Sequence, residues 1–267
     1  MIDTVRSADG TTIALQRVTD GPRPMVTLAG GPSGRASWAA AAAGLEGRFA
    51  VWLADRRGRG DSGDTPPYSF EREYDDVEAL CAFLGPGTVV AAHSSGAVCT
   101  LGAAARGLRA SALVLYEPPW PLTGRPDQSD VLDRMDAQVA AGDPEGALVT
   151  GLRELVRVPD AAIEGMRRTP IWAGRVANAA VWSREGRELH RMPEGTAALV
   201  GLGVPTLMLL GTESPRHLHD STHAVADALH HATVVELSGQ EHAALQTAPT
   251  LVTEAILSYF QRPNPLA

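Results

Sequence analysis

Short apolar runs alternate with amphipathic segments along most of the chain. Continuous runs of this kind are typical of strands buried on both faces of a sheet, and they occupy residues 25–29, 50–54, 88–92, 111–116, 204–210 and 233–237. Apolar residues with helical spacing lie mostly between these runs, at residues 36–46, 69–84, 95–107, 216–230 and 243–260. The alternation predicts a mostly parallel sheet covered by helices on both faces, which is an α/β fold.

Two features interrupt the alternation. Before it, two β-like segments flank the turn at Asp9 and Gly10 and predict a hairpin. Within it, a stretch of helical character that is punctuated by prolines begins at the motif EPPWP and runs over 118–201. We therefore expect a core domain formed by residues 1–117 and 202–267, with a helical insertion at 118–201.

Composition narrows the functional classes. The net charge of −8 argues against nucleic acid as a partner, and no apolar run approaches the roughly 20 residues that span a bilayer. The chain contains no lysine, which excludes P-loop phosphate binding and Schiff-base chemistry. The arginines of DRRGRGDSGD are expected to lie in a solvated loop. Cys81 and Cys99 suggest no disulfide framework, and the N-terminus lacks signal-peptide character, so we expect a cytoplasmic protein.

Two adjacent serines in AAHSSGAV are candidate nucleophiles. A serine on the tight turn between a strand and a helix needs small residues two positions before and two positions after it. Ala92 and Gly96 meet this need for Ser94, whereas His93 would crowd the turn if Ser95 were the nucleophile. Ser94 is therefore the predicted nucleophile. Ser95 then begins a helix, where its free N–H and the helix dipole favour an oxyanion.

Four stretches together resemble the α/β-hydrolase family. They are LAGGPSG (28–34), DRRGRGDSG (55–63), AHSSG at the nucleophile, and SGQEHAAL (238–245). The resemblance implies an α/β-hydrolase fold with a mostly parallel eight-stranded sheet and helices on both faces. It also implies that 118–201 is a helical cap inserted between strands 6 and 7. His242 occupies the position of the general base, and Gly31 occupies the position of the second oxyanion donor, with Ala29 where a histidine is frequent.

The acid of the triad departs from the family pattern. The usual aspartate position, three residues beyond the glycine after the seventh strand, is Ser214. Two glutamates remain as candidates. Glu117 ends the preceding strand, and Glu213 lies one residue from the usual site. The sequence leaves both open, and both preserve the chain order serine, acid, histidine.

The expected activity is hydrolysis of an ester-like or activated carbonyl small molecule through a serine, histidine, glutamate triad and an acyl-enzyme. Gly30 and the tryptophans Trp120, Trp172 and Trp182 are candidates for the substrate pocket. The hydrolase resemblance implies no metal or organic cofactor. His219 and His223 have the spacing of a helical zinc pair, but no third ligand is evident from the sequence. Two alternatives stay open: a carbon–carbon bond hydrolase, and a non-hydrolytic protein on this scaffold, either a biosynthetic cyclase or lyase or a small-molecule binder. A small-molecule substrate is the expected partner, and the oligomeric state, monomer or homodimer, is left open by the sequence.

Overall fold

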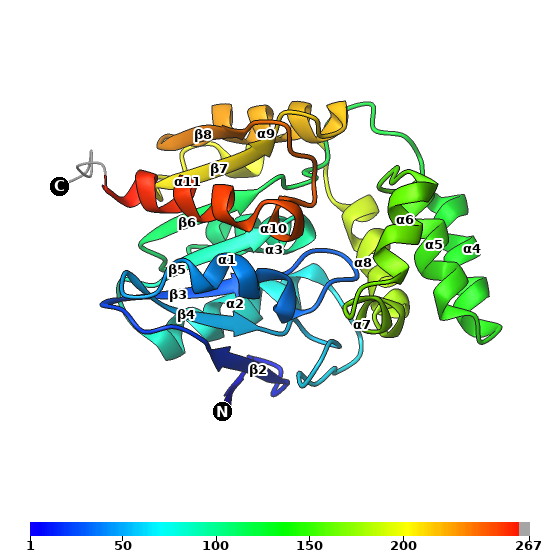
Figure 1. Ribbon diagram of the computed structural model, residues 1–267, viewed down its shortest axis with the longest axis horizontal. Helices are drawn as coiled ribbons and strands as arrows, with labels where there is room; N and C mark the ends of the chain where they lie inside the picture. Colours follow the sequence, from blue (N-terminus) through cyan, green and yellow to red (C-terminus); the bar gives the residue numbers. More distant parts are fainter. Residues whose placement is uncertain (262–267) are drawn as a thin grey trace.

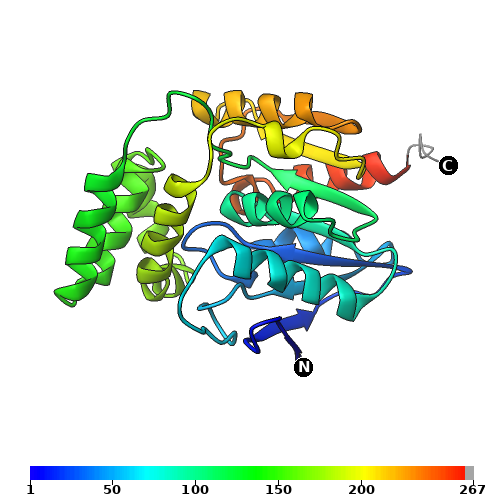
Figure 2. The ribbon, with the colours of Figure 1, turned by 180° about the vertical axis from the view of Figure 1, so that it is seen from behind.

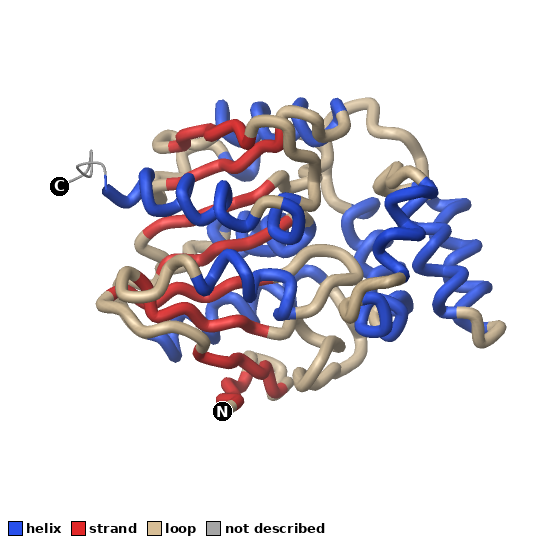
Figure 3. The backbone as a smooth tube through the Cα atoms, viewed as in Figure 1, coloured by secondary structure: helices blue, strands red, loops and turns tan. Residues whose placement is uncertain are grey.

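The computed structural model describes residues 1–261 and contains one sheet of eight strands (Figures 1 and 3). The strands are β1 (Ile2–Arg6), β2 (Thr12–Arg17), β3 (Arg23–Leu28), β4 (Phe49–Ala54), β5 (Val89–His93), β6 (Ala112–Tyr116), β7 (Thr206–Gly211) and β8 (Ala232–Leu237). Their spatial order is β1-β2-β4-β3-β5-β6-β7-β8. The first two pairings, β1 with β2 and β2 with β4, are antiparallel, and all the others are parallel. The predicted α/β fold with a mostly parallel sheet is confirmed.

Helices cover both faces of this sheet. The covering elements are η1 (Arg35–Trp38), α1 (Ala39–Ala43), α2 (Phe70–Leu84), α3 (Ser95–Ala105), α9 (Arg216–Ala228), α10 (Ala244–Thr247) and α11 (Pro249–Gln261). The helices α1, α10 and α11 lie on the face towards the viewer in Figure 1, and α2, α3 and α9 lie on the opposite face, seen in Figure 2. Each face buries its own apolar cluster, so the central strands β5 and β6 are buried along their whole length.

Two helices expected from the sequence are divided in the structure. Residues 36–46 form a 3-10 turn followed by the short α1, which ends at Gly44. The final helical region splits into α10 and α11 because Pro249 lacks an N–H and can only begin a new helix. The division lets the short α10 follow directly after the loop that carries His242.

The segment between β6 and β7 holds a separate group of helices. These are α4 (Ser129–Ala140), α5 (Pro144–Glu154), α6 (Asp160–Arg167), α7 (Trp172–Ala177) and α8 (Ala179–Arg191), followed by η2 (Ala197–Leu199). They share an apolar cluster of their own and gather beyond one end of the sheet (Figures 1 and 2). We call α4–α8 the cap helices. No helix in the described part of the chain is long and apolar enough to cross a membrane.

Candidate active site

Ser94 lies on a sharp turn between β5 and α3. Its backbone has φ 53° and ψ −125°, a conformation that a residue with a side chain adopts at a cost. The turn fits only because its neighbours are glycines. A Cβ atom at Gly96 would lie 2.6 Å from the carbonyl oxygen of Ala29, and one at Gly30 would lie 2.5 Å from Cβ of Ser94. The small residues in the sequence therefore allow the backbone to present the Ser94 side chain at the end of the sheet.

Glu117 and His242 meet at the same end of the sheet. Glu117 directly follows β6 and is fully buried, with φ 46°. Its Oε2 contacts Nδ1 of His242, while its Oε1 accepts hydrogen bonds from the N–H of Gly211 at 2.7 Å and from the hydroxyl of Ser214 at 2.6 Å. The serine at the usual aspartate position thus supports a carboxylate supplied by the neighbouring strand.

The structure does not bring the other candidate acid to the histidine. The side chain of Glu213 is exposed, and within residues 1–261 its carboxylate accepts only a long hydrogen bond of 3.5 Å from the hydroxyl of Thr212. The backbone explains this orientation, because the N–H of Glu213 is tied to the carbonyl of Gln240 while the next residue, Ser214, turns inward. This corrects the alternative in which Glu213 serves as the acid.

Ser94 and His242 line one pocket of about 540 Å³. Within residues 1–261, the Ser94 hydroxyl makes no hydrogen bond in the resting structure. Because Nδ1 of His242 faces a carboxylate, its proton lies on that side and Nε2 is left as the proton acceptor. Catalytic hydrogen bonds are commonly long in unliganded sites and shorten when substrate binds.

His93 and Tyr116 hold the loop that carries His242. Nε2 of the buried His93 donates to the carbonyl of His242 at 3.0 Å, and the two imidazole rings lie 4.4 Å apart. The Tyr116 hydroxyl donates to the carbonyl of Glu241 and accepts from the N–H of Ala244 at 3.2 Å. Burial and the nearby charge of His242 hold the pKa of His93 well below its ordinary value, so His93 stays neutral. Sequence analysis did not single out Tyr116, because its hydrogen-bond partners lie about 125 residues away along the chain.

The Gly31 amide, predicted to be the second oxyanion donor, already has a hydrogen-bond acceptor. The N–H of Gly31 donates to the Ser95 hydroxyl at 2.8 Å and is therefore already engaged. The same hydroxyl oxygen accepts a hydrogen bond of 3.0 Å from Nη1 of Arg56. The amide predicted to donate to the oxyanion is thus engaged in this structure, because the Ser95 side chain turns back towards Gly31. The N–H of Ser95, at the first position of α3, has no acceptor within its helix.

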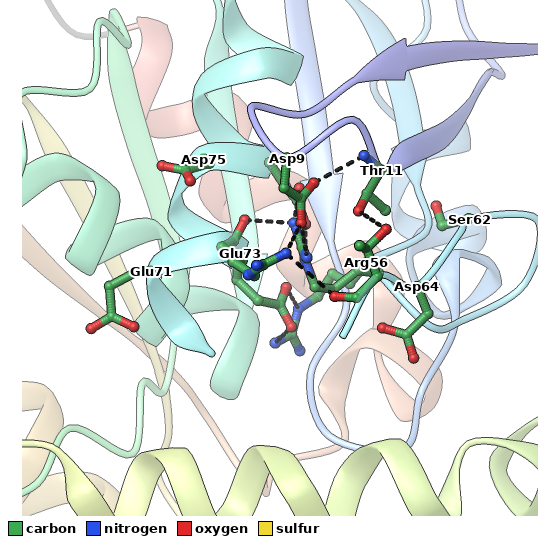
Figure 4. A network of polar contacts seen from close by, with 12 residues as sticks. Asp9, Thr11, Arg56, Ser62, Asp64, Glu71, Glu73 and Asp75 are labelled. Atoms are coloured by element: carbon green, nitrogen blue, oxygen red, sulfur yellow. Dashed lines mark hydrogen bonds and ion pairs between the residues drawn. The ribbon is translucent and has the colours of Figure 1, made fainter. Parts of the chain in front are cut away.

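The arginine-rich segment is buried, contrary to the expected solvated loop. Arg56, Arg57 and Arg59 are at most 3% exposed. Their charges are paired by carboxylates from distant elements: Arg56 binds Glu73 of α2 through two hydrogen bonds of 2.9 and 3.0 Å (Figure 4). Burial favours a raised pKa at Glu73, but the charges of Arg56 and Arg59 outweigh it and hold the pKa below its ordinary value.

A second carboxylate connects these arginines to the cap helices. Glu185 of α8 is 2% exposed, pairs with Nη1 of Arg56 at 2.8 Å and contacts Nη2 of Arg59. Arg59 also donates to the carbonyl of Gly31 at 3.0 Å. Sequence patterning could not reveal these contacts, because the partners are far apart along the chain.

Two of the three candidate tryptophans line the pocket. Trp120 and Trp182 face it, and Nε1 of Trp182 lies near the backbone of Gly31. Trp172 instead packs in the apolar cluster of the cap helices beneath Arg167, whose guanidinium carbon lies 5.1 Å from its ring centroid. Gly30 does not line the pocket either, because it lies against the backbone of the Ser94 turn. These two assignments are corrected. Among residues 1–261, no cluster of three or more potential ligands is placed to hold a metal ion.

Comparison with known proteins gives a consistent family. A family model described as the alpha/beta hydrolase family matches residues 25–255. An alpha/beta hydrolase from Sphaerobacter thermophilus is 36% identical, has a TM-score of 0.86, and is matched over 97% of this chain and 100% of that chain. An esterase from Thermogutta terrifontis, solved with malate bound, is 22% identical with a TM-score of 0.76 over 98% of both chains.

A further structure, like that esterase, is less than 25% identical and shows the fold alone. The N-formylmaleamic acid deformylase of Pseudomonas putida is 19% identical with a TM-score of 0.71 over 95% of this chain and 100% of that chain. No curated protein shows a significant match.

Proposed function

We propose that this chain, which belongs to the alpha/beta hydrolase family, is a serine hydrolase of ester-like or similarly activated carbonyl compounds. The observation that carries the proposal is the contact between Glu117 and His242, in a pocket that also holds the strained Ser94. Solved structures with this fold include proteins named as an esterase and a deformylase, which fits acyl-transfer chemistry.

Each member of the proposed triad has a distinct task. Ser94 attacks the substrate carbonyl while Nε2 of His242 removes the serine proton. The buried carboxylate of Glu117 orients the imidazole and stabilises the imidazolium that forms. Two hydrogen bonds from Gly211 and Ser214 keep the other carboxylate oxygen in place, so rotation of the acid is restricted.

The cycle then proceeds through an acyl-enzyme. The tetrahedral intermediate collapses, and the imidazolium gives its proton to the leaving group. Water enters the pocket, loses a proton to the same histidine and releases the acyl group, which regenerates the Ser94 hydroxyl. The N–H of Ser95 at the start of α3 supplies one donor to the oxyanion in both halves. The partly apolar pocket with Trp120 and Trp182 suits a small organic substrate.

Turnover of simple esters tests the proposal. The purified chain should hydrolyse at least one p-nitrophenyl ester from a series of acyl lengths, and Ser94→Ala should lose turnover to background. Wild-type protein that is folded but hydrolyses none of the esters would contradict the proposal and favour a non-hydrolytic scaffold. Activity that persists in Ser94→Ala would contradict the assigned nucleophile.

A further inference from the structure

The Ser95 hydroxyl accepts two hydrogen bonds but donates none to the described residues. A serine hydroxyl can accept two hydrogen bonds and donate one. The Ser95 oxygen accepts two, from the N–H of Gly31 at 2.8 Å and from Nη1 of Arg56 at 3.0 Å. Its own proton has no acceptor among residues 1–261. Ser95 as a whole is 5% exposed, and it lines the pocket together with Ser94.

A buried donor without an acceptor destabilises the folded protein and needs an explanation. Both acceptor sites of the oxygen are occupied by donors, so the proton must point away from Gly31 and Arg56. The remaining direction is the pocket that Ser95 lines. Hydrogen bonds received from a guanidinium and an amide also polarise the hydroxyl and make it a stronger donor.

We propose that the Ser95 hydroxyl, and not the N–H of Gly31, is the second donor to the oxyanion. The inference rests on the proposed serine hydrolase function. When Ser94 attacks, the electron pair of the carbonyl moves onto oxygen, and that oxygen accepts one hydrogen bond from the N–H of Ser95 and one from its O–H. No proton is transferred to it, and both hydrogen bonds lengthen again when the carbonyl reforms.

The cap helices take part in positioning this donor. Arg56, which holds the Ser95 oxygen, is itself paired with Glu185 of α8 at 2.8 Å. Arg59, which also contacts Glu185, donates to the carbonyl of Gly31 at 3.0 Å. Both sides of the oxyanion site are therefore tied to a single carboxylate on a cap helix. Glu185 is a positioning residue whose pairing depends on α8 lying against the core.

Removal of the Ser95 hydroxyl distinguishes between the two possible second donors, the Ser95 O–H and the Gly31 N–H. In Ser95→Ala the backbone N–H remains, and the N–H of Gly31 loses its acceptor and becomes free to face the pocket. If the hydroxyl is the donor, kcat for an ester falls by about 10²–10³-fold, with a smaller change in KM. If Gly31 is the donor, kcat is unchanged or rises, and this result would overturn the inference.

Three further measurements guard against a merely structural effect. Ser95→Thr keeps a hydroxyl and should recover most of the turnover lost in Ser95→Ala. Ser37→Ala removes a different buried serine hydroxyl, one without a hydrogen-bond partner among the described residues, and should turn over esters like wild type. Inhibition by phenylboronic acid, which forms a tetrahedral adduct on serine, should weaken in Ser95→Ala in parallel with kcat.

A double-mutant cycle with Ser95→Ala tests the positioning role of Glu185. Glu185→Gln should lower kcat by up to about 100-fold with little change in KM, as expected for a misplaced catalytic group. The double variant with Ser95→Ala should lose little more than Ser95→Ala alone, because both changes act on the same donor. Fully additive losses would contradict the positioning role. Absence of ester turnover in the wild type would instead remove the proposed function, before any variant is compared.

Discussion

Among residues 1–261, three non-glycine residues hold backbone φ angles in the left-handed region: Ser94 at 53°, Glu117 at 46° and Arg157 at 64°. Such a conformation costs about 1–2 kcal/mol for a residue with a Cβ atom. Two of the three are the proposed nucleophile and its acid, and the third follows α5 at the pocket. Backbone strain is thus concentrated where the proposed chemistry takes place. The strain at Ser94 could be predicted from the small residues around it, whereas the strain at Glu117 leaves no mark in the sequence.

Substitution of the two glutamates separates their roles. Glu117→Gln keeps the shape of the side chain but removes the charge that stabilises the imidazolium, so kcat should fall by about 10³–10⁴-fold. Glu213→Gln changes an exposed carboxylate and should keep near wild-type kcat. Steady-state ester hydrolysis measures both. A large loss in Glu213→Gln together with an active Glu117→Gln would reverse the assignment.

The buried His93 should make stability depend on pH. Its pKa is lowered in the folded protein, so between that value and about 6.5 the unfolded chain binds a proton that the folded chain does not. The stabilisation is complete above about pH 6.5 and is lost as the pH falls below it, by up to about 1.4 kcal/mol per pH unit. Burial, followed by the charges of His242 and Arg157, also lowers the pKa of His217, which adds in the same direction.

Denaturant unfolding at pH 7.0, 6.0 and 5.5 measures this dependence. His93→Gln removes the titrating group, so the loss of unfolding free energy between pH 6.0 and 5.5 should be smaller than in wild type. An identical slope in the two proteins would show that His93 does not carry the effect.

The carboxyl ends of the parallel strands bring Ser94, Glu117 and His242 together. Parallel strands point their carboxyl ends to one edge of the sheet, so the loops after β5, β6 and β8 converge although they are distant in sequence. The apolar runs predicted these strands well, because continuous burial leaves a clear signal. The arginine segment was misjudged for a related reason. Its pairing partners lie 17 and 126 residues away, on α2 and α8, and local patterning cannot reveal them.

Two adjacent residues of α8 form ion pairs with the core domain, one buried and one partly exposed to solvent. Glu185 is buried against Arg56 and Arg59, whereas Arg184 pairs with Asp64 at 30% and 34% side-chain exposure. Glu185→Gln should lower the free energy of unfolding by about 3–5 kcal/mol, because it leaves buried guanidinium charges partly unpaired. Arg184→Gln should cost less than about 1 kcal/mol. Equal losses in urea unfolding would contradict the importance of the buried pair.

At the scale of the whole molecule, the order of the strands brings the proposed catalytic residues together. Residues 94 and 117 directly follow the adjacent strands β5 and β6, and residue 242 lies in the loop after the edge strand β8. The four family-like stretches predicted that Ser94 and His242 lie at the same pocket. They did not predict which glutamate contacts His242, or that the Gly31 amide is engaged by Ser95. Both depend on side-chain orientations that appear only once distant segments have packed.

The central claim is that Ser94 is an activated nucleophile, and covalent labelling tests it most directly. Folded wild-type protein should react with a fluorophosphonate to one label per chain, and tandem mass spectrometry of the digested protein should place the label on Ser94. Labelling should be abolished in Ser94→Ala and strongly slowed in His242→Gln. A wild-type protein that stays unlabelled under conditions that saturate a known serine hydrolase, or a label on another residue, would contradict the account.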